Sequence, residues 1–304
     1  MNGVLTSGNI VLDILVRPVE EVTWGVTRWV DSIDSSLGGN GANTASAIAI
    51  LGVPSRLLGM IGPDSFGAAC RERLVACGVD LAALQTGANP TATSIVLVQE
   101  SGARTFLHRP GSSQEVFSGG VRLEAGFGHY HLANVFALPN LRHSAPAVLA
   151  QARALGMTTS LDTAWDARGE WMSVLEQCLP QLDILFVNED EARMLSGSVE
   201  PEANAEFFRS GGARTFVMKL GPRGCAIFAG GESCLVPGFR VEAVDTTGAG
   251  DCFAGAFLAS RQKGFSLEES ARIANAVGAM IVQQVGATTG LRSWDETLAW
   301  IASR

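Results

Sequence analysis

The sequence predicts an α/β protein with a mostly parallel central sheet that helices cover on both faces. Short apolar, β-type runs alternate with helical patterns along most of the chain, and this alternation is typical of parallel sheets with crossover helices. The apolar fraction of 47% is ample for a large core. A chain of 304 residues can form one large α/β domain. We therefore expect a single three-layer α/β/α domain, residues 1–304.

The expected elements follow one another in a regular order. Strands are expected at residues 4–8, 56–61, 130–133, 158–162, 184–187 and 215–220. Helices are expected at residues 43–51, 64–78, 144–155, 189–195, 251–263 and 267–284. Capping and breaking residues mark the ends, because Asp64 is a favourable N-cap and Gly52 and Pro54 close the first helix.

Two segments interrupt the alternation. Residues 14–36 contain strand-type residues but no helical pattern. Residues 93–108 read as a β-hairpin, with strands at 94–99 and 104–108 and a turn at 100–103. We expect these segments, about 14–36 and 93–109, to pair into a small sheet outside the main one.

Charge and cysteine usage exclude several classes of function. The formal net charge is −8, which argues against binding to a nucleic-acid backbone. The start of the chain carries no basic and apolar signal, and no apolar run approaches the length of a membrane span. The six cysteines show no C-x-x-C spacing, so free thiols in a reducing cytoplasm are expected rather than a zinc site. We expect a cytoplasmic protein without nucleic-acid or membrane partners.

The most informative segment is residues 245–251, with the sequence DTTGAGD. It precedes an apolar run that predicts a helix beginning at Gly250 or Asp251. The N–H groups of Gly248, Ala249 and Gly250 at a helix start would bind phosphate oxygens. Asp251 at the edge of that site could accept a hydroxyl proton, which together would suit phosphoryl transfer to an alcohol. The alternative is a glycine-rich turn in which Asp251 only caps the helix.

This segment resembles the C-terminal signature of the PfkB carbohydrate kinases, the ribokinase-like family. Four further segments resemble landmarks of that family in the same order: 38–43 (GGNGAN), 62–67 (GPDSFG), 188–191 (NEDE) and 219–224 (KLGPRG). The resemblance runs from about residue 8 to residue 290. It implies a ribokinase-like fold in which the small sheet is a lid over the sugar, and Asp251 is the catalytic base.

The resemblance also implies where the substrates bind. Asp13 would accept sugar hydroxyl groups, beside a glycine-rich segment whose members would approach or hydrogen-bond the sugar: Gly38, Gly39, Asn40 and Asn43. The ATP site would include, besides Gly250, a strand-end loop and two amides: Asn188, Lys219, Gly221, Gly224 and Asn275. Asn275 could instead be a satisfied core amide.

Two ion sites follow from the same resemblance. Asn188 and Glu191 would organise magnesium and phosphate, mainly through water, although acidic residues are also common in a first helical turn. Asp245 and the Thr247 carbonyl would belong to a monovalent-cation loop for potassium, completed by carbonyls near residues 281, 284, 286 and 290. Asp245 could equally be a turn-stabilising residue.

The expected activity is ATP-dependent transfer of the γ-phosphate to a primary hydroxyl of a sugar. The substrate stays open, because residues 162–166 (DTAWD) lack the Asp-x-Asn-x-Arg pattern of many fructokinases and no glutamate follows residue 133 as in ribokinase. One alternative is a nucleoside kinase whose base pocket would use Trp24, Trp29 and Phe106. Another is a catalytically silent sugar-binding regulator. Trp24 and Trp29 could also form a homodimer contact through the lid, or pack on the sugar or the main domain.

Overall fold

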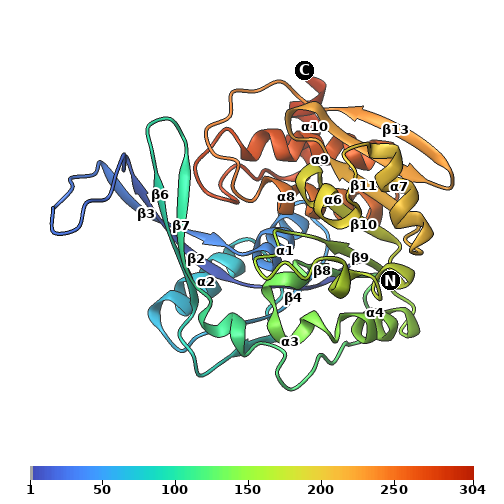
Figure 1. Ribbon diagram of the computed structural model, residues 1–304, viewed down its shortest axis with the longest axis horizontal. Helices are drawn as coiled ribbons and strands as arrows, with labels where there is room; N and C mark the ends of the chain where they lie inside the picture. The colour runs from blue at the N-terminus through green and yellow to red at the C-terminus, as the bar shows by residue number, and fades with distance from the viewer. Residues whose placement is uncertain (1–2) are drawn as a thin grey trace.

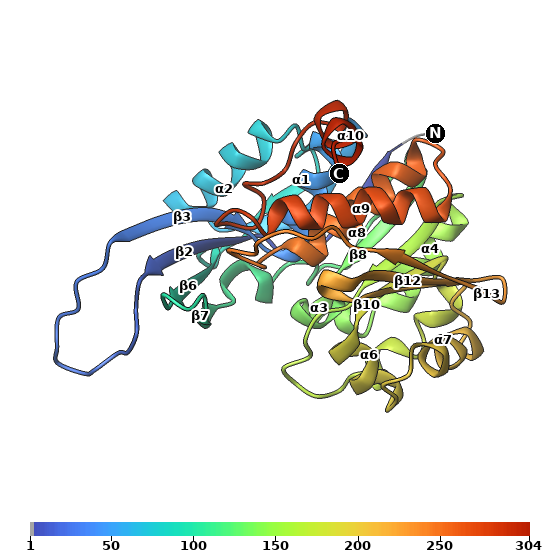
Figure 2. The ribbon, with the colours of Figure 1, turned by 90° about the horizontal axis from the view of Figure 1, so that it is seen from above.

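The computed structural model describes residues 3–304, and its strands form two sheets (Figures 1 and 2). The central sheet has nine strands in the order β13-β12-β11-β10-β9-β8-β1-β4-β5. Its strands are β1 (Val4–Ser7), β4 (Ser55–Ile61), β5 (Leu84–Thr86), β8 (His129–Ala133), β9 (Thr158–Asp162), β10 (Ile184–Asn188), β11 (Thr215–Lys219), β12 (Gly224–Ala229) and β13 (Glu232–Pro237). Neighbours from β5 to β11 pair in parallel, and β11, β12 and β13 pair antiparallel.

Helices cover both faces of this sheet, as the alternation predicted (Figure 2). One face carries α1 (Asn40–Ile50), α8 (Ala249–Gln262), α9 (Leu267–Ile281) and α10 (Trp294–Ala302). The other carries α3 (Pro139–Arg142), α4 (Ala145–Ala154), α5 (Met172–Leu175), α6 (Glu189–Ser196) and α7 (Pro201–Ser210). Helix α2 (Ser65–Ala76) packs beside the base of the smaller sheet. The three-layer fold class is therefore confirmed.

The smaller sheet has the strand order β3-β2-β6-β7, and we call it the lid sheet. Its strands are β2 (Val11–Arg17), β3 (Ser32–Gly38), β6 (Ala92–Val98) and β7 (Arg104–Arg109). The predicted hairpin corresponds to β6 and β7, which pair antiparallel, while β2 and β6 pair in parallel and join the two predicted segments. The lid sheet extends from one side of the body (Figure 1).

The observed elements differ from the prediction in two ways. Strands β5, β12 and β13 and helices α3, α5, α7 and α10 were not predicted. Gly230-Gly231, both with positive φ, forms the kind of turn that joins hairpin strands such as β12 and β13. The first helix begins at Asn40 rather than at residue 43, because Gly39 serves as its N-cap with φ 92°. Asn40 and Asn43 therefore lie one helical turn apart on the same face of α1.

Within residues 3–304, no helix has both the length and the apolar character needed to cross a membrane.

Candidate active site

The Asp251 carboxylate lies in the first turn of α8 and faces the first turn of α1. Its Oδ1 accepts a hydrogen bond from Asn40 Nδ2 at 2.7 Å, and its Oδ2 accepts one from Asn43 Nδ2 at 2.8 Å. The structure thus brings Asp251 together with two predicted residues that lie more than 200 positions earlier in the sequence. Asp251 is not the helix cap, since Gly248 holds that position, so the capping alternative is wrong.

Close backbone contact positions the two asparagines. A Cβ atom on Gly41 would lie 2.5 Å from the Cα of Gly8, so only glycine lets the start of α1 rest against the end of β1. Just beyond β1, Asn9 Oδ1 accepts the Asn40 N–H at 3.0 Å. These contacts hold Asn40 and Asn43 toward α8.

The start of α8 exposes backbone N–H groups, as the sequence predicted. Gly248 adopts φ 73° and provides no side-chain cap. Among residues 3–304, the N–H groups of Gly248 and Gly250 have no hydrogen-bond partner, whereas that of Ala249 donates to the Thr246 carbonyl at 3.3 Å. Two of the three predicted donors are therefore available to an anion, and the third is engaged by its own turn.

Burial raises the pKa of the Asp251 carboxyl above its ordinary value. The hydrogen bonds from Asn43 and Asn40 and the charge of Lys219 lower it in part. A carboxylate with a raised pKa is a stronger proton acceptor than an exposed one.

Lys219, at the end of β11, lies beside the start of α8. Its ammonium group donates to Asp162 Oδ1 at 2.6 Å, and a Cβ atom on Gly250 would be 3.4 Å from Lys219 Nζ. Burial alone would lower the pKa of Lys219, but the nearby carboxylates of Asp162 and Glu191 raise it, so the group stays charged. A phosphate at Gly250 would meet this positive charge.

Asp162, at the end of β9, was not predicted as a site residue. Burial raises its pKa to about 7, although Lys219 opposes this effect. Its Oδ2 is buried and has no hydrogen-bond partner within the described residues. An unpaired buried carboxylate oxygen is costly, and such an atom commonly marks a place where a ligand binds. The only sequence signal was an acidic residue at the carboxyl end of a parallel strand.

Asn188 and Glu191 form a capping box at the start of α6. Glu191 N–H donates to Asn188 Oδ1 at 2.8 Å, and Glu191 Oε2 accepts from Asn188 N–H at 3.0 Å and from Thr163 Oγ1 at 2.8 Å. Asn188 Oδ1 is thus engaged by the backbone. Glu191 and the unpaired Oδ2 of Asp162 fit the one or two carboxylates that magnesium uses together with water and phosphate.

Asp13, on β2, is the buried carboxylate of the lid sheet. A Cβ atom on Gly38 would lie 2.0 Å from Asp13 Oδ2, so glycine at position 38 makes room for this side chain. Burial raises the pKa of Asp13 to about 6, and the charges of Asp245 and Asp251 add to the effect. These three carboxylates are therefore close enough to interact across the space between lid and body.

Asp245 joins three parts of the chain. Its Oδ1 accepts the Thr247 N–H at 2.8 Å, and its Oδ2 accepts the Gly286 N–H at 2.9 Å. The guanidinium of Arg104, from the lid sheet, pairs with the same Oδ1. A potassium ion would have to displace Arg104 to reach that oxygen. The Asp245 carboxylate therefore does not fit the predicted potassium site while Arg104 is in place.

The predicted nucleotide residues differ in their surroundings. Gly221 has φ 57° and open space where a Cβ would point, whereas a Cβ on Gly224 would collide with Val236 O at 2.1 Å. Gly221 thus leaves room for a ligand, while Gly224 serves close backbone packing. The amide of Asn275 donates to the carbonyls of Val236 at 3.0 Å and Pro237 at 3.2 Å, as a satisfied core amide does.

Asn134 is a further residue that the sequence did not single out. It follows β8 in the left-handed region, with φ 61°. Its Oδ1 accepts the Ala137 N–H at 3.1 Å, and its Nδ2 donates to Asn40 Oδ1 at 2.8 Å. This orientation turns the Asn40 amide so that its Nδ2 donates to Asp251.

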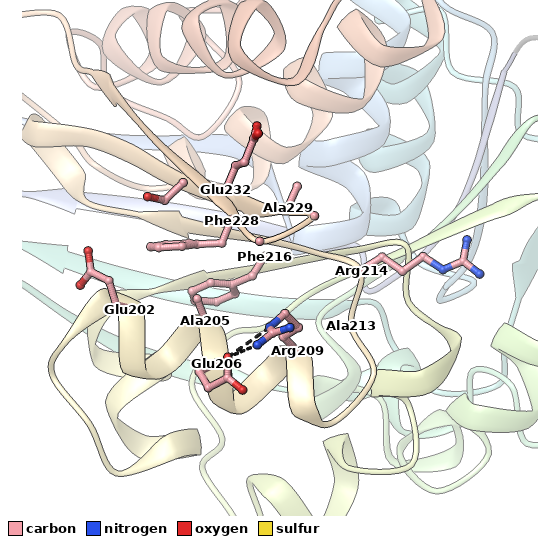
Figure 3. Close-up of a pocket in the computed structure, with 13 residues that line it drawn as sticks. Glu202, Ala205, Glu206, Arg209, Ala213, Arg214, Phe216, Phe228, Ala229 and Glu232 are labelled. Carbon is pink, nitrogen blue, oxygen red and sulfur yellow. Dashed lines mark hydrogen bonds and ion pairs between the residues drawn. The ribbon is translucent and has the colours of Figure 1, made fainter.

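Two cavities differ in their relation to the predicted site. One, of about 480 Å³, lies between lid and body and has Leu15, Arg104 and Asp245 in its walls. Trp24, Trp29 and Phe106 do not line it. The other, of about 260 Å³, lies between α7 and the β12–β13 hairpin, where Arg209 pairs with Glu206, and contains none of the predicted residues (Figure 3).

In this three-layer α/β/α fold, bare N–H groups at a helix start lie beside a buried carboxylate, an arrangement that suits phosphoryl transfer to an alcohol. Comparison with known proteins defines the class further. The model of the PfkB family of carbohydrate kinases matches residues 6–294. The chain therefore belongs to the PfkB family of carbohydrate kinases, and is an enzyme that transfers a phosphoryl group to an alcohol.

Individual relatives agree with this assignment. The ATP-dependent ribose-1-phosphate kinase of Halopiger xanaduensis is 29% identical over 306 residues, covering 96% of this chain and 99% of that protein. Fructokinase-1 of Oryza sativa subsp. japonica is 31% identical over 287 residues, covering 88% of each. The structure of Arabidopsis thaliana ribokinase with ribose and ATP matches with a TM-score of 0.85 at 25% identity, covering 99% of this chain and 98% of that one.

Proposed function

We propose that this protein is an ATP-dependent sugar kinase in which Asp251 is the general base. The observation that carries the proposal is the Asp251 carboxylate, held by Asn40 and Asn43 beside the bare N–H groups that begin α8. A sugar hydroxyl between Asp251 and these N–H groups would lose its proton to the carboxylate. Its oxygen would form a bond to the γ-phosphorus while the bond to the β,γ-bridging oxygen breaks and ADP leaves.

Positive groups at the start of α8 would stabilise the charge on the transferred phosphoryl group. The N–H groups of Gly248 and Gly250 have no hydrogen-bond partner among residues 3–304, and the helix dipole favours an anion there. The Lys219 ammonium, close to Gly250, would bind the same phosphate while it keeps its hydrogen bond to Asp162. Gly221 leaves space for the nucleotide, and Asn275 would flank the adenine while its Nδ2 stays bonded to the carbonyls of Val236 and Pro237.

Magnesium would complete this charge compensation. Glu191 and the unpaired Asp162 Oδ2 would hold the ion through water and phosphate oxygens, with Asn188 ordering the start of α6. When bound, the ion neutralises the β- and γ-phosphates. Asp162 was not among the magnesium-binding residues that the sequence predicted.

The sugar would bind between the lid sheet and the body. Asp13 is buried on the lid side, and Asn43 has an Oδ1 that is buried without a hydrogen-bond partner in residues 3–304. Both are acceptors for sugar hydroxyl groups. Gly38 makes room for the Asp13 carboxylate, and Gly39, with φ 92°, packs against the Asn9 backbone beside it. A primary hydroxyl suits this arrangement, because it can extend from the ring toward Asp251.

A nucleoside substrate has weaker support. Trp24 and Trp29 are 95% and 93% exposed, and with Phe106 they lie outside the cavity between lid and body. The side chains of Trp24 and Trp29 therefore face solvent and do not enclose a pocket for a base in this conformation. Their exposure instead favours the proposed homodimer, in which the lid of a second copy covers them, because exposed aromatic clusters commonly mark interfaces.

The test is ADP release with pentoses, hexoses, sugar acids, sugar phosphates and nucleosides, in buffer that contains magnesium and potassium. We expect one group of sugars to support turnover. Asp251→Asn should lower kcat by roughly 10²–10⁴-fold, because the base is lost while the shape of the site is kept. An unchanged melting temperature would show that the variant is folded.

Other results would reject the proposal. Turnover with a nucleoside alone would favour the nucleoside kinase. Ligands that raise the melting temperature without any turnover would favour a sugar-binding regulator. A fully active Asp251→Asn variant would remove Asp251 as the base while leaving the kinase assignment intact.

A further inference from the structure

Asp245 fixes the position of the loop that leads into α8. It is only 6% exposed, and its two oxygens accept the N–H groups of Thr247 and Gly286. Three residues along, Gly248 packs so closely on the loop after α9 that an added Cβ would lie 2.5 Å from the Cβ of Ala287. The N–H groups that would bind phosphate therefore depend on how Asp245 holds these two loops together.

Arg104 attaches the lid sheet to this same loop. It begins β7, beside the tip of the β6–β7 hairpin (Figure 1). Its guanidinium contacts Asp245 Oδ1 and Thr247 Oγ1, and donates to Thr246 Oγ1 at 2.7 Å. The Arg104 side chain is 17% exposed, although the rest of β7 is exposed along its length. Arg104 is thus the side chain by which this solvent-facing strand reaches the body.

We propose that Arg104 is a positioning residue that couples the lid hairpin to the phosphate-binding start of α8, and that its guanidinium supplies the positive charge at Asp245 in place of a free monovalent cation. This inference rests on the proposed function for its effect on catalysis. It departs from the potassium site expected at Asp245 and Thr247, since the guanidinium occupies the carboxylate oxygen that the ion would need.

The charges at this contact support the pairing. Burial would raise the pKa of Asp245, but the N–H groups of Gly286 and Thr247 and the charge of Arg104 lower it below its ordinary value. Asp245 is therefore ionised, and a buried carboxylate needs a cationic partner. No other residue makes an ion pair with Asp245 within the described part of the chain. Loss of Arg104 would leave the charge without compensation and loosen the loop.

The contact also links two sides of the sugar site. The lid contributes Asp13 from β2, and Arg104 lies on the same sheet, two strands away in the order β2-β6-β7. The body contributes Asp251 and the N–H groups that follow Asp245. A lid seated by Arg104 would therefore bring the sugar acceptor and the phosphate site into register together, as closing lids do in other enzymes.

The cavity of about 480 Å³ makes the contact accessible to a small ion. Arg104 and Asp245 both line it, together with Arg17 and Val244. If Arg104 is shortened to alanine, guanidinium or potassium from solution could reach Asp245. Such rescue distinguishes a missing charge from a damaged fold, because a merely structural defect would not respond to a small cation.

The experiment measures kcat of wild type, Arg104→Ala, Arg104→Lys and a control variant, Arg17→Ala. Each protein is assayed with tetramethylammonium, potassium or guanidinium chloride at low millimolar concentration. Arg17 is a matched control because it lines the same cavity but donates a hydrogen bond to Ser32 rather than to Asp245. We expect wild type and Arg17→Ala to have the same kcat in all three buffers. Arg104→Ala should lose roughly 10–100-fold in kcat in tetramethylammonium, as small misplacements of catalytic groups do, and recover with guanidinium or potassium. Arg104→Lys should keep most of the activity.

Two results would overturn the inference. One is a wild type that needs potassium as strongly as Arg104→Ala does, and the other is an Arg104→Ala variant with unchanged kcat. If wild type phosphorylates no substrate, the proposed function fails. The coupling of Arg104 to the start of α8 is then tested without an activity assay, by amide hydrogen exchange at residues 246–250. Faster exchange in Arg104→Ala than in wild type and Arg17→Ala supports the coupling, and equal exchange rejects it.

Discussion

The two sheets of this protein are covered to very different extents. In the central sheet, β10 is buried along Ile184 to Val187 between two helical layers. In the lid sheet, Phe106 and Leu107 on β7 are 52% and 60% exposed. A sheet covered on both faces can hold catalytic groups in place, whereas a sheet attached by few contacts can move. We therefore expect the chemistry to depend on the body, and substrate closure and any association to depend on the lid.

The largest expected difference concerns a buried arginine of the body. Arg142 is fully buried, and it pairs with both oxygens of Asp166 at 2.7 Å. Arg142→Ala should lower the free energy of unfolding by about 3–5 kcal/mol, because Asp166 would keep a buried charge without a partner. In the lid, Arg28→Ala removes an exposed pair with Glu21 and should cost less than about 1 kcal/mol. Chemical denaturation measures both, and similar losses would contradict the contrast between body and lid.

The next effect is on the pH dependence of catalysis. Asp13 has a pKa of about 6 in the empty site, and burial also raises the pKa of Asp251. Both must be ionised to accept hydrogen bonds or a proton, so activity is lost as the pH falls. Protonation of Asp13 alone should lower kcat/KM for the sugar by about tenfold per pH unit below about pH 6, and protonation of Asp251 would make the decrease steeper. The variant Asp13→Asn should lack the part of this acidic decrease in kcat/KM that comes from protonation of Asp13. A wild-type kcat/KM that stays constant down to pH 5 would contradict the prediction.

A smaller effect is expected where a side chain acts through another. Asn134→Ala removes the donor that orients the Asn40 amide toward Asp251. A lost hydrogen bond of about 1–1.5 kcal/mol corresponds to roughly tenfold in kcat/KM. Asn140→Ala is a matched control, because its amide donates to the backbone at Gln114 and Val116, away from Asp251. Equal kinetics for the two variants would show that Asn134 does not position Asn40.

The smallest effect on folding is expected at the tip of the lid. Replacing the exposed Trp24 and Trp29 by serine should leave the melting temperature nearly unchanged, because surface substitutions usually alter stability by less than about 0.5 kcal/mol. If the lid forms the homodimer, the double variant should sediment as a monomer while wild type sediments as a dimer. A wild-type monomer, or a dimer that survives both substitutions, would reject the lid contact.

Much of the fold and part of the site could be predicted from local sequence signals. The alternation of apolar strands and helical patterns is a local property, and it predicted the layers and most elements of the central sheet. The glycines at 248 and 250 marked the helix start, because bare backbone at such a position has a recognisable composition. The sequence also assigned Asn40 and Asn43 to sugar binding and Asp251 to catalysis, although these residues come from two distant motifs.

Other features depend on contacts between distant segments, which only the tertiary structure decided. The pairing of Arg104 with Asp245 joins residues 141 positions apart, and Asn134 reaches Asn40 across 94 positions. Neither residue stands out in the sequence, because an arginine in a hairpin and an asparagine in a turn are common at protein surfaces. Asp162 likewise became a candidate site residue only through the pairing of β9 with β10 and its contact with Lys219. The sequence by itself determined which elements form and where the backbone is bare, whereas packing determined which side chains meet, because a partner's identity depends on strand order and register rather than on local composition.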